Sequence, residues 1–213
     1  MGRIIASENV SLDGVVQDPA GDEGFSRGGW IGRVGGKGRE EAAQLLLDEA
    51  LGAEALLLGR QSHDFFAARW PSRSGELADR LNALPKYVVC STLDSIWNNS
   101  TALRGDVVNE VSELKQQLDG DIIIYASFQL VRPLMEHGLV DELRLMIYPV
   151  VLGAGERFFG ETSDKKPMHL VNIRPVGGGL ALLTYEPVGR ISPPGAGRGV
   201  NRRPASEGAS PIG

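Results

Sequence analysis

Two short segments combine residue types that bind anions, and each follows a run of apolar residues. One is Leu58-Gly59-Arg60-Gln61-Ser62 and the other is Tyr125-Ala126-Ser127-Phe128-Gln129. A helical spacing of apolar residues comes next in both cases, so each segment is predicted to turn a strand into a helix. The first N–H groups of a helix lack an internal acceptor, and that helix end carries about +0.5 charge. Both turns therefore suit a phosphate.

Two such turns at one edge of a sheet suit the two phosphates of a dinucleotide, because ligands of open α/β sheets bind outside the carboxyl ends of the strands. Gly59 would let the backbone approach closely, and Ser62 could cap its helix or donate to a phosphate. Arg60 could reach an additional phosphate with its forked guanidinium. A glycine after a strand also occurs in ordinary turns, so each segment alone is a weak signal.

Other familiar motifs are missing from the sequence. No G-x-G-x-x-G follows the first expected strand, and no G-x-x-x-x-G-K-[ST] occurs. His63, His137 and His169 lack metal-ligand spacing among themselves or with Cys90, so no metal site is expected.

The elements that would position the two turns alternate between strand and helix. Strands are expected at 3–10, 55–58, 86–90, 121–125 and 142–151, helices at 40–51, 75–84 and 110–118, a minor strand at 106–108, and a closing hairpin from 168–173 and 180–185. The run 121–125 is apolar without alternation, which is typical of a strand buried on both faces. This pattern predicts an α/β fold in three layers, with a mostly parallel central sheet, antiparallel edge strands and flanking helices.

Composition narrows the class of protein. A net charge of −5 does not indicate binding to nucleic acid or to an anionic membrane. No apolar run approaches the roughly 20 residues that span a bilayer. The beginning of the chain lacks a secretory signal, and the lone Cys90 agrees with a reducing compartment, so a cytoplasmic location is expected. Residues 1–189 are predicted to form one domain, and the Gly-, Pro- and Arg-rich segment 190–213 a disordered tail.

A series of motifs carries a family resemblance. They are Ser11-Leu12-Asp13-Gly14, Leu57-Leu58-Gly59-Arg60-x-Ser62, Leu84-Pro85-Lys86-Tyr87-Val88-Val89-x-Ser91-Thr92, Leu139-Val140-Asp141-Glu142-Leu143 and Pro149-Val150-Val151-Leu152-Gly153-x-Gly155. In this order they resemble the dihydrofolate-reductase-like superfamily. The similarity is greater to the reductase (C-terminal) domain of the bacterial riboflavin-biosynthesis deaminase/reductase and its stand-alone relatives. It covers about residues 1–187.

The resemblance implies an NADPH cofactor and hydride transfer to a small heterocyclic substrate. The implied cofactor-binding residues are Gly59, Arg60, Ser62, Ser91, Thr92, Ala126, Ser127, Phe128 and Gln129, with Ser91 and Thr92 near the adenosine 2′-phosphate. Relatives usually carry glycine at the position of Ala126. The zinc signature of the deaminase domain is absent, so only the reduction is expected.

The same resemblance places Asp13 and Gly14 beside the nicotinamide and substrate, and Gly153 and Gly155 in a loop close by. Asp13 is a candidate acid, but it could equally be a turn residue. Trp30, in a glycine-rich loop, could stack on a planar substrate or belong to the core.

Three functions remain open from the sequence. One is an NADPH-dependent reductase resembling 5-amino-6-(5-phosphoribosylamino)uracil reductase, another is a non-catalytic NADP(H)-binding module, and the third is a dihydrofolate reductase-type activity. A homodimer is also expected, because the apolar strands at 143–152 and 180–185 offer more apolar edge than one body of this size would cover.

Overall fold

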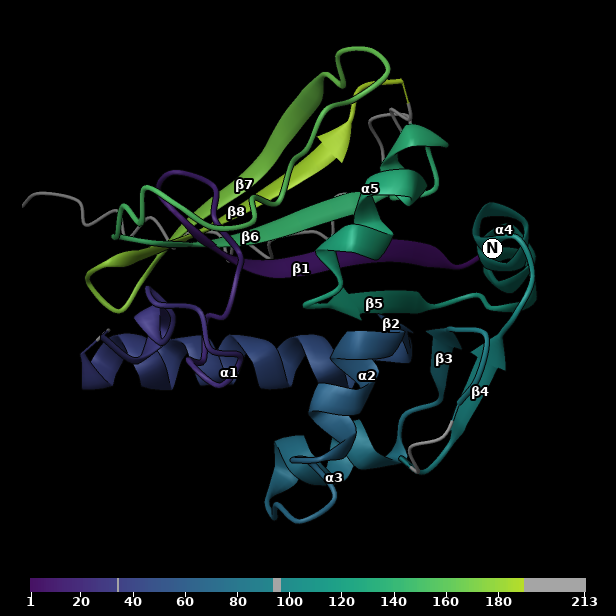
Figure 1. The fold of residues 1–213 in the computed structure, drawn as a ribbon, viewed down its shortest axis with the longest axis horizontal. Helices are drawn as coiled ribbons and strands as arrows, with labels where there is room; N and C mark the ends of the chain where they lie inside the picture. Colours follow the sequence, from purple (N-terminus) through teal and green to yellow (C-terminus); the bar gives the residue numbers. More distant parts are fainter. Residues whose placement is uncertain (34, 94–96, 190–213) are drawn as a thin grey trace, which may run out of the picture.

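The computed structural model describes residues 1–33, 35–93 and 97–189, and within them the chain forms one eight-stranded sheet (Figure 1). The strands are β1 (Arg3–Ser11), β2 (Ala53–Gly59), β3 (Lys86–Val89), β4 (Ser100–Leu103), β5 (Asp121–Tyr125), β6 (Glu142–Tyr148), β7 (Met168–Val176) and β8 (Leu180–Pro187). The helices are η1 (Trp30–Arg33), α1 (Gly36–Gly52), α2 (Arg60–Ala67), α3 (Glu76–Ala83), α4 (Val107–Gln117) and α5 (Phe128–Glu136). The predicted tail at 190–213 lies outside the described residues.

The strand order is β4-β3-β2-β5-β1-β6-β8-β7, and only β8 and β7 run antiparallel to their neighbours. Helices cover both faces, with α1 and α3 on one and α4 and α5 on the other (Figure 1). The predicted fold class, a mostly parallel sheet with antiparallel edge strands and flanking helices, is confirmed.

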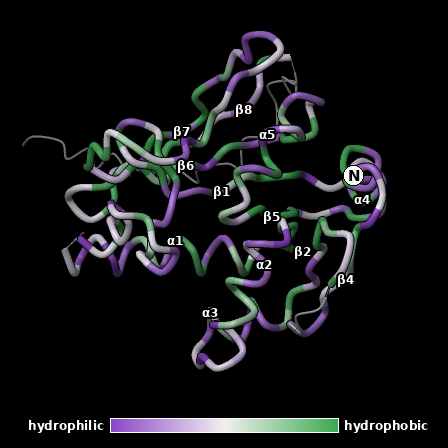
Figure 2. Tube along the Cα trace, viewed as in Figure 1, coloured by the Kyte–Doolittle hydropathy of each residue, from purple (hydrophilic) through white to green (hydrophobic). Residues whose placement is uncertain are grey.

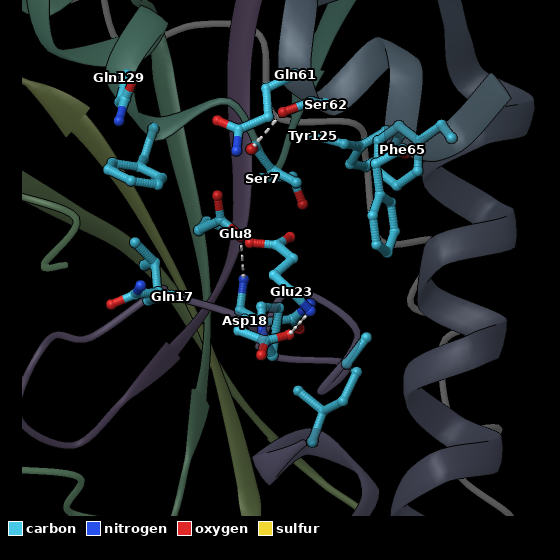
Figure 3. Close-up of a pocket in the computed structure, with 18 of the residues that line it drawn as sticks. Ser7, Glu8, Gln17, Asp18, Glu23, Gln61, Ser62, Phe65, Tyr125 and Gln129 are labelled. Atoms are coloured by element: carbon cyan, nitrogen blue, oxygen red, sulfur yellow. Dashed lines mark hydrogen bonds between the residues drawn. The ribbon is translucent and has the colours of Figure 1, made fainter. Parts of the chain in front are cut away.

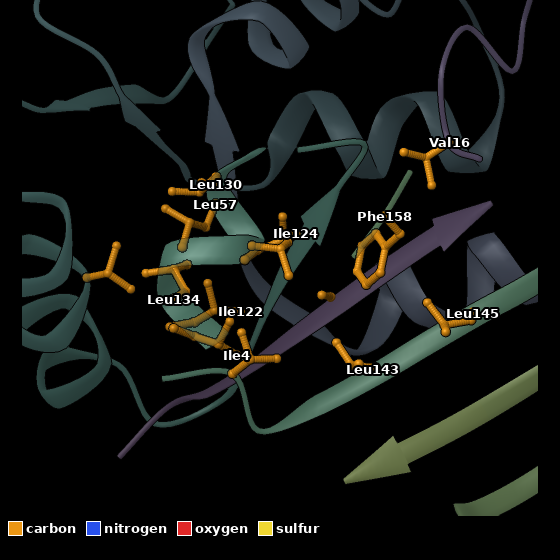
Figure 4. Close-up of a cluster of buried hydrophobic side chains, with 14 of the residues drawn as sticks. Ile4, Val16, Leu57, Ile122, Ile124, Leu130, Leu134, Leu143, Leu145 and Phe158 are labelled. Carbon is orange, nitrogen blue, oxygen red and sulfur yellow. The ribbon is translucent and has the colours of Figure 1, made fainter. Parts of the chain in front are cut away.

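Alternating residues of the central strands supply the two cores. Ile122 and Ile124 of β5 face α4 and α5, whereas Ile123 and Tyr125 face α1 and α3. Figure 4 shows the first of these clusters, in which Leu130 and Leu134 of α5 pack over the sheet. Hydrophobic residues gather around β2 and β5, at the centre of the fold (Figure 2).

The carboxyl edge of the sheet has an opening at β5. The last pair between β1 and β5 is Ser7 with Tyr125, after which β5 ends. β1 continues to Ser11 and pairs there only with β6, while β2 runs on to Gly59. A gap therefore forms between the ends of β1 and β2, where open α/β sheets bind ligands.

Two local predictions were wrong. The segment 106–108 is not a strand, because Asp106 is the N-cap of α4 and its carboxylate accepts a hydrogen bond from the Asn109 N–H at 3.0 Å. The strands at 143–152 and 180–185, which were expected to offer an apolar edge, lie inside the sheet. β6 is between β1 and β8, and β8 is between β6 and β7. The strand at that edge is β7, which exposes Leu170, Val171 and Ile173.

Candidate active site

A cavity of about 320 Å³ occupies the gap at the carboxyl edge (Figure 3). Its walls come from β1, from the loop between β1 and η1, from α2, and from the turn that begins α5. Phe65, Phe66 and Trp70 form an apolar side, while Gln61 and Gln129 add amide groups. An apolar cleft with a few convergent polar groups is the usual form of a small-molecule site.

The two turns singled out from the sequence lie together at this cavity. The Gly59 N–H donates to Ser127 Oγ at 3.0 Å, and Ser127 Oγ donates to the Tyr125 carbonyl at 3.0 Å. Ser62 Oγ donates to the Ala126 carbonyl at 2.6 Å. These bonds hold the starts of α2 and α5 side by side, although 64 residues separate Ser62 from Ala126.

Both helix starts have the features of a phosphate site. The N-cap residues are Gly59 for α2 and Ser127 for α5, and neither caps its helix with a side-chain hydrogen bond. The first N–H groups of each helix can therefore serve a ligand. Ala126 has φ +51°, the left-handed conformation that glycine adopts without strain. The backbone geometry of the turn is thus present without the glycine, so the turns fit a dinucleotide.

Arg60 lies at the rim of the cavity rather than among its lining residues. Its guanidinium forms an ion pair with Asp64 at 2.8 Å and donates to Thr92 Oγ1 at 2.9 Å. The structure thus places Arg60, which the resemblance implies for the cofactor's phosphates, against Thr92, which it implies near the 2′-phosphate. The neighbouring Asp64 offsets part of the positive charge that a phosphate would meet there.

Asp13 and the glycines near it lie outside the cavity. The Asp13 carboxylate accepts hydrogen bonds from the N–H groups of Leu152 and Gly153, at 3.0 and 2.8 Å, and from Ser11 Oγ at 2.7 Å. The bond from Leu152, with smaller help from the others, lowers the pKa of Asp13 to about 2. A carboxyl that is ionised at neutral pH cannot donate a proton, so this geometry fits a residue that fastens two loops together.

None of Asp13, Gly14, Gly153 and Gly155 lines the cavity. Gly155 has φ +111°, and a Cβ there would come within 2.8 Å of Val15 Cγ1. Its lack of a side chain therefore serves the close packing of the loop after β6.

Trp30 is a core residue in the structure. Its side chain is 2% exposed and meets the ring of Tyr148 edge-on, with 5.3 Å between ring centroids. Its indole N–H donates to the Gln17 carbonyl at 3.0 Å. Trp30 does not line the cavity but supports Gln17, which does.

Sequence reasoning missed several polar residues of the cavity. Glu8 of β1 is 8% exposed, and Glu23 of the following loop lies across from it (Figure 3). Asp18 fixes that loop, because its carboxylate accepts from the N–H groups of Glu23 and Phe25, at 3.1 and 3.0 Å. The available signal for Glu8 was a glutamate between the apolar residues Ile4 to Ala6 and Val10 of the first strand.

Burial dominates the electrostatics of Glu8. Loss of solvent, together with the charge of Glu23, raises the pKa of Glu8 to about 8, against an opposing hydrogen bond from the Asn9 N–H. Burial and the charge of Asp18 also raise the pKa of Glu23. No lysine or arginine is among the described residues that line this cavity. Any phosphate at this cavity would therefore rely on the N–H groups at the starts of α2 and α5.

The described residues offer no helix with the length and apolar character needed to cross a membrane. Among the same residues, no group of three or more His, Cys, Asp or Glu side chains is placed to hold a metal ion.

The sheet order, the flanking helices and the cleft beyond β5 define a dihydrofolate-reductase-like α/β protein. A dihydrofolate reductase from Enterococcus faecalis complexed with NADP(H) and RAB-propyl shares the fold, with a TM-score of 0.52 and 14% identity over 87% of this chain and 96% of that one. The family model of the RibD C-terminal domain matches residues 3–182, so the chain belongs to that family. Membership supports a reductase-type function.

Relatives of known sequence or structure agree with this assignment. The uncharacterised protein YyaP of Bacillus subtilis (strain 168) is 31% identical over 137 residues, which are 62% of this chain and 73% of YyaP. A Shewanella sp. PV-4 protein named for riboflavin biosynthesis superposes with a TM-score of 0.69 and 18% identity over 87% of this chain and 98% of that one. RibD of Acinetobacter baumannii has a TM-score of 0.59 and 15% identity, and the match covers 88% of this chain and 58% of RibD.

Proposed function

We propose that this protein is an NADPH-dependent reductase that transfers a hydride to a small heterocyclic substrate, as 5-amino-6-(5-phosphoribosylamino)uracil reductase does. The observation that carries the proposal is the joining of the two helix-starting turns beside a largely apolar cavity. Membership of the RibD C-terminal domain family also supports a reductase-type function.

Each part of the site has a role in this proposal. The N–H groups at the starts of α2 and α5 hold the two phosphates, and Arg60 with Thr92 faces the 2′-phosphate. NADPH, when bound, supplies the hydride. Phe65 and Trp70 flank a planar substrate, and the amides of Gln61 and Gln129 orient it. The buried walls exclude water from the reacting atoms.

A binding experiment tests the cofactor site. NADPH and NADH are titrated by nicotinamide fluorescence into wild type, Arg60→Ala and Arg174→Ala; Arg174 is an exposed arginine on β7 and serves as the control for loss of one positive charge. We expect tighter binding of NADPH than of NADH, lost in Arg60→Ala and kept in Arg174→Ala. Failure of wild type to bind either nucleotide would refute the proposal.

Turnover separates the remaining alternatives. NADPH oxidation is measured with 5-amino-6-(5-phosphoribosylamino)uracil and with dihydrofolate. Reduction of dihydrofolate alone would indicate a dihydrofolate reductase-type activity. Intact NADPH binding with no turnover over a broad panel of heterocycles would indicate a non-catalytic NADP(H)-binding module.

We also propose a homodimer in which β7 meets a second copy. Leu170, Val171 and Ile173 of this edge strand are 44%, 48% and 59% exposed. An apolar edge strand invites pairing with another strand. Light scattering at micromolar concentration should give twice the mass of one chain, and Ile173→Glu should halve it. A wild-type mass of one chain would contradict the dimer.

A further inference from the structure

Glu8 is a buried carboxyl group among the residues that line the cavity. It lies one residue beyond the last pair of β1 with β5, so its side chain enters the gap that the end of β5 leaves open. Figure 3 shows Glu8 between the α2 side, with Gln61 and Ser62, and the loop that carries Glu23. The carboxyl therefore faces the cavity in which the proposed function places the substrate.

Burial is the main reason that Glu8 keeps its proton, and the charge of Glu23 adds to it. Glu23, Asp18 and Glu156, three further acidic residues, line the same cavity. On the neighbouring strand β6, Arg144 is held by Glu49 and Glu142, at 2.9 and 2.5 Å. With burial added, the pKa of Glu8 rises to about 8, so this carboxyl is largely protonated at neutral pH.

We propose that Glu8 is the general acid of the reduction, which rests on the proposed function. The substrate has a polarised C=N or C=O bond, and its carbon receives the hydride from the nicotinamide cofactor. The O–H bond of the Glu8 carboxyl breaks, and a new N–H or O–H bond forms at the adjacent heteroatom. The substrate gains two electrons and one proton in addition to the hydrogen nucleus of the hydride. The Glu8 carboxylate then regains its proton from water.

Other groups in the site fit this role less well. Asp13 is ionised and lies outside the cavity. Tyr125 lines the cavity, and no described residue accepts from its buried hydroxyl in hydrogen-bond geometry, although Glu49 lies near enough to act on its charge. Burial raises the pKa of Tyr125, so its hydroxyl stays protonated and can orient a ligand by donating a hydrogen bond.

A direct titration of the carboxyl tests the assignment without turnover. The protein is labelled with ¹³C at the glutamate carboxyls, and the Glu8 signal is identified by its absence in Glu8→Gln. We expect a midpoint near pH 8 for Glu8 instead of the ordinary 4.5. Glu23→Gln is the matched variant and should move the midpoint downward, because it removes a like charge. A midpoint near 4.5 in wild type would overturn the proposal.

Turnover with 5-amino-6-(5-phosphoribosylamino)uracil completes the test. Glu8→Gln should lose about 10²-fold or more in kcat, the range for loss of a general acid, with NADPH affinity unchanged. Wild-type kcat should fall above about pH 8, and the residual rate of Glu8→Gln should not follow that profile.

The outcomes separate the two proposals. If the wild-type protein reduces the substrate and Glu8→Gln has the same kcat, only the assignment of Glu8 as the general acid is refuted. A larger loss in Glu23→Gln than in Glu8→Gln would also overturn that assignment and move the role to Glu23. If wild type neither binds NADPH nor reduces any heterocycle, the proposed function and the role of Glu8 fall together.

Discussion

Replacing Ala126 by glycine should stabilise this protein, although alanine-to-glycine changes usually destabilise. Ala126 has φ +51°, and a side chain in the left-handed region costs roughly 1–2 kcal/mol. Glycine adds about 0.4–1 kcal/mol of conformational entropy to the unfolded chain, which opposes the gain. The net expectation is a gain of about 0.5–1 kcal/mol in the free energy of unfolding.

The structure gives reason to expect that the turn keeps its conformation in the variant. The Ala126 carbonyl accepts from Ser62 Oγ at 2.6 Å, and the next residue, Ser127, is 5% exposed and bonded to Gly59. These contacts do not involve the methyl group of Ala126. Its removal should therefore relieve strain without loosening the turn.

Chemical and thermal unfolding measure the effect, with Ala43→Gly as the control. Ala43 is exposed in the middle of α1, where glycine costs about 0.5–1 kcal/mol. We expect Tm to rise by about 1–4 °C in Ala126→Gly and to fall in Ala43→Gly. Equal losses in the two variants would show that Ala126 stores no strain, and the reasoning would be wrong.

Three further predictions concern residues around the cavity. Asp18→Ala should lower the free energy of unfolding by about 1–3 kcal/mol, measured in urea, because the N–H groups of Glu23 and Phe25 lose the buried carboxylate that accepts from them. Trp30→Ala should cost about 3–5 kcal/mol in the same assay, and a loss below 1 kcal/mol would argue against its core position. The lowered pKa of Asp13 adds stability that is complete above pH 3.8 and disappears as pH falls through about 2. Asp13→Asn should therefore weaken the loss of stability at acid pH, and an unchanged loss would contradict the three hydrogen bonds that its carboxylate accepts.

Local patterns were enough to find the elements that carry the two turns. The run Asp121–Tyr125 was recognisable because unbroken apolar β-branched residues are typical of a strand covered on both faces, and β5 has those bounds. The helix that contains Phe65 and Phe66 followed its strand as expected, as α2. The minor strand at 106–108 failed because Asp106 acts through its side chain as an N-cap, which apolar periodicity does not report.

The roles of single residues that the sequence offered for the site depended on contacts between distant segments. Asp13 looked like a candidate acid beside its glycine, but its chemistry is set by N–H groups of Leu152 and Gly153, 139 and 140 residues away. Trp30 could stack or pack on sequence grounds, and the position of Tyr148 in the folded chain places it in the core. Burial of this kind is a property of the assembled layers.

The sequence by itself determined the class of the fold, the succession of strands and helices along the chain, and the two turns that suit phosphates. These features depend on residues close together in the chain, where period, glycine and capping groups act directly. Only the tertiary structure joined the two turns through Ser127 and Ser62, left β7 as the apolar edge, and enclosed Glu8 in a cavity with Glu23. The pKa of a carboxyl depends on the solvent and charges that surround it, and for Glu8 those surroundings exist only after the sheet, the loop and α2 have come together.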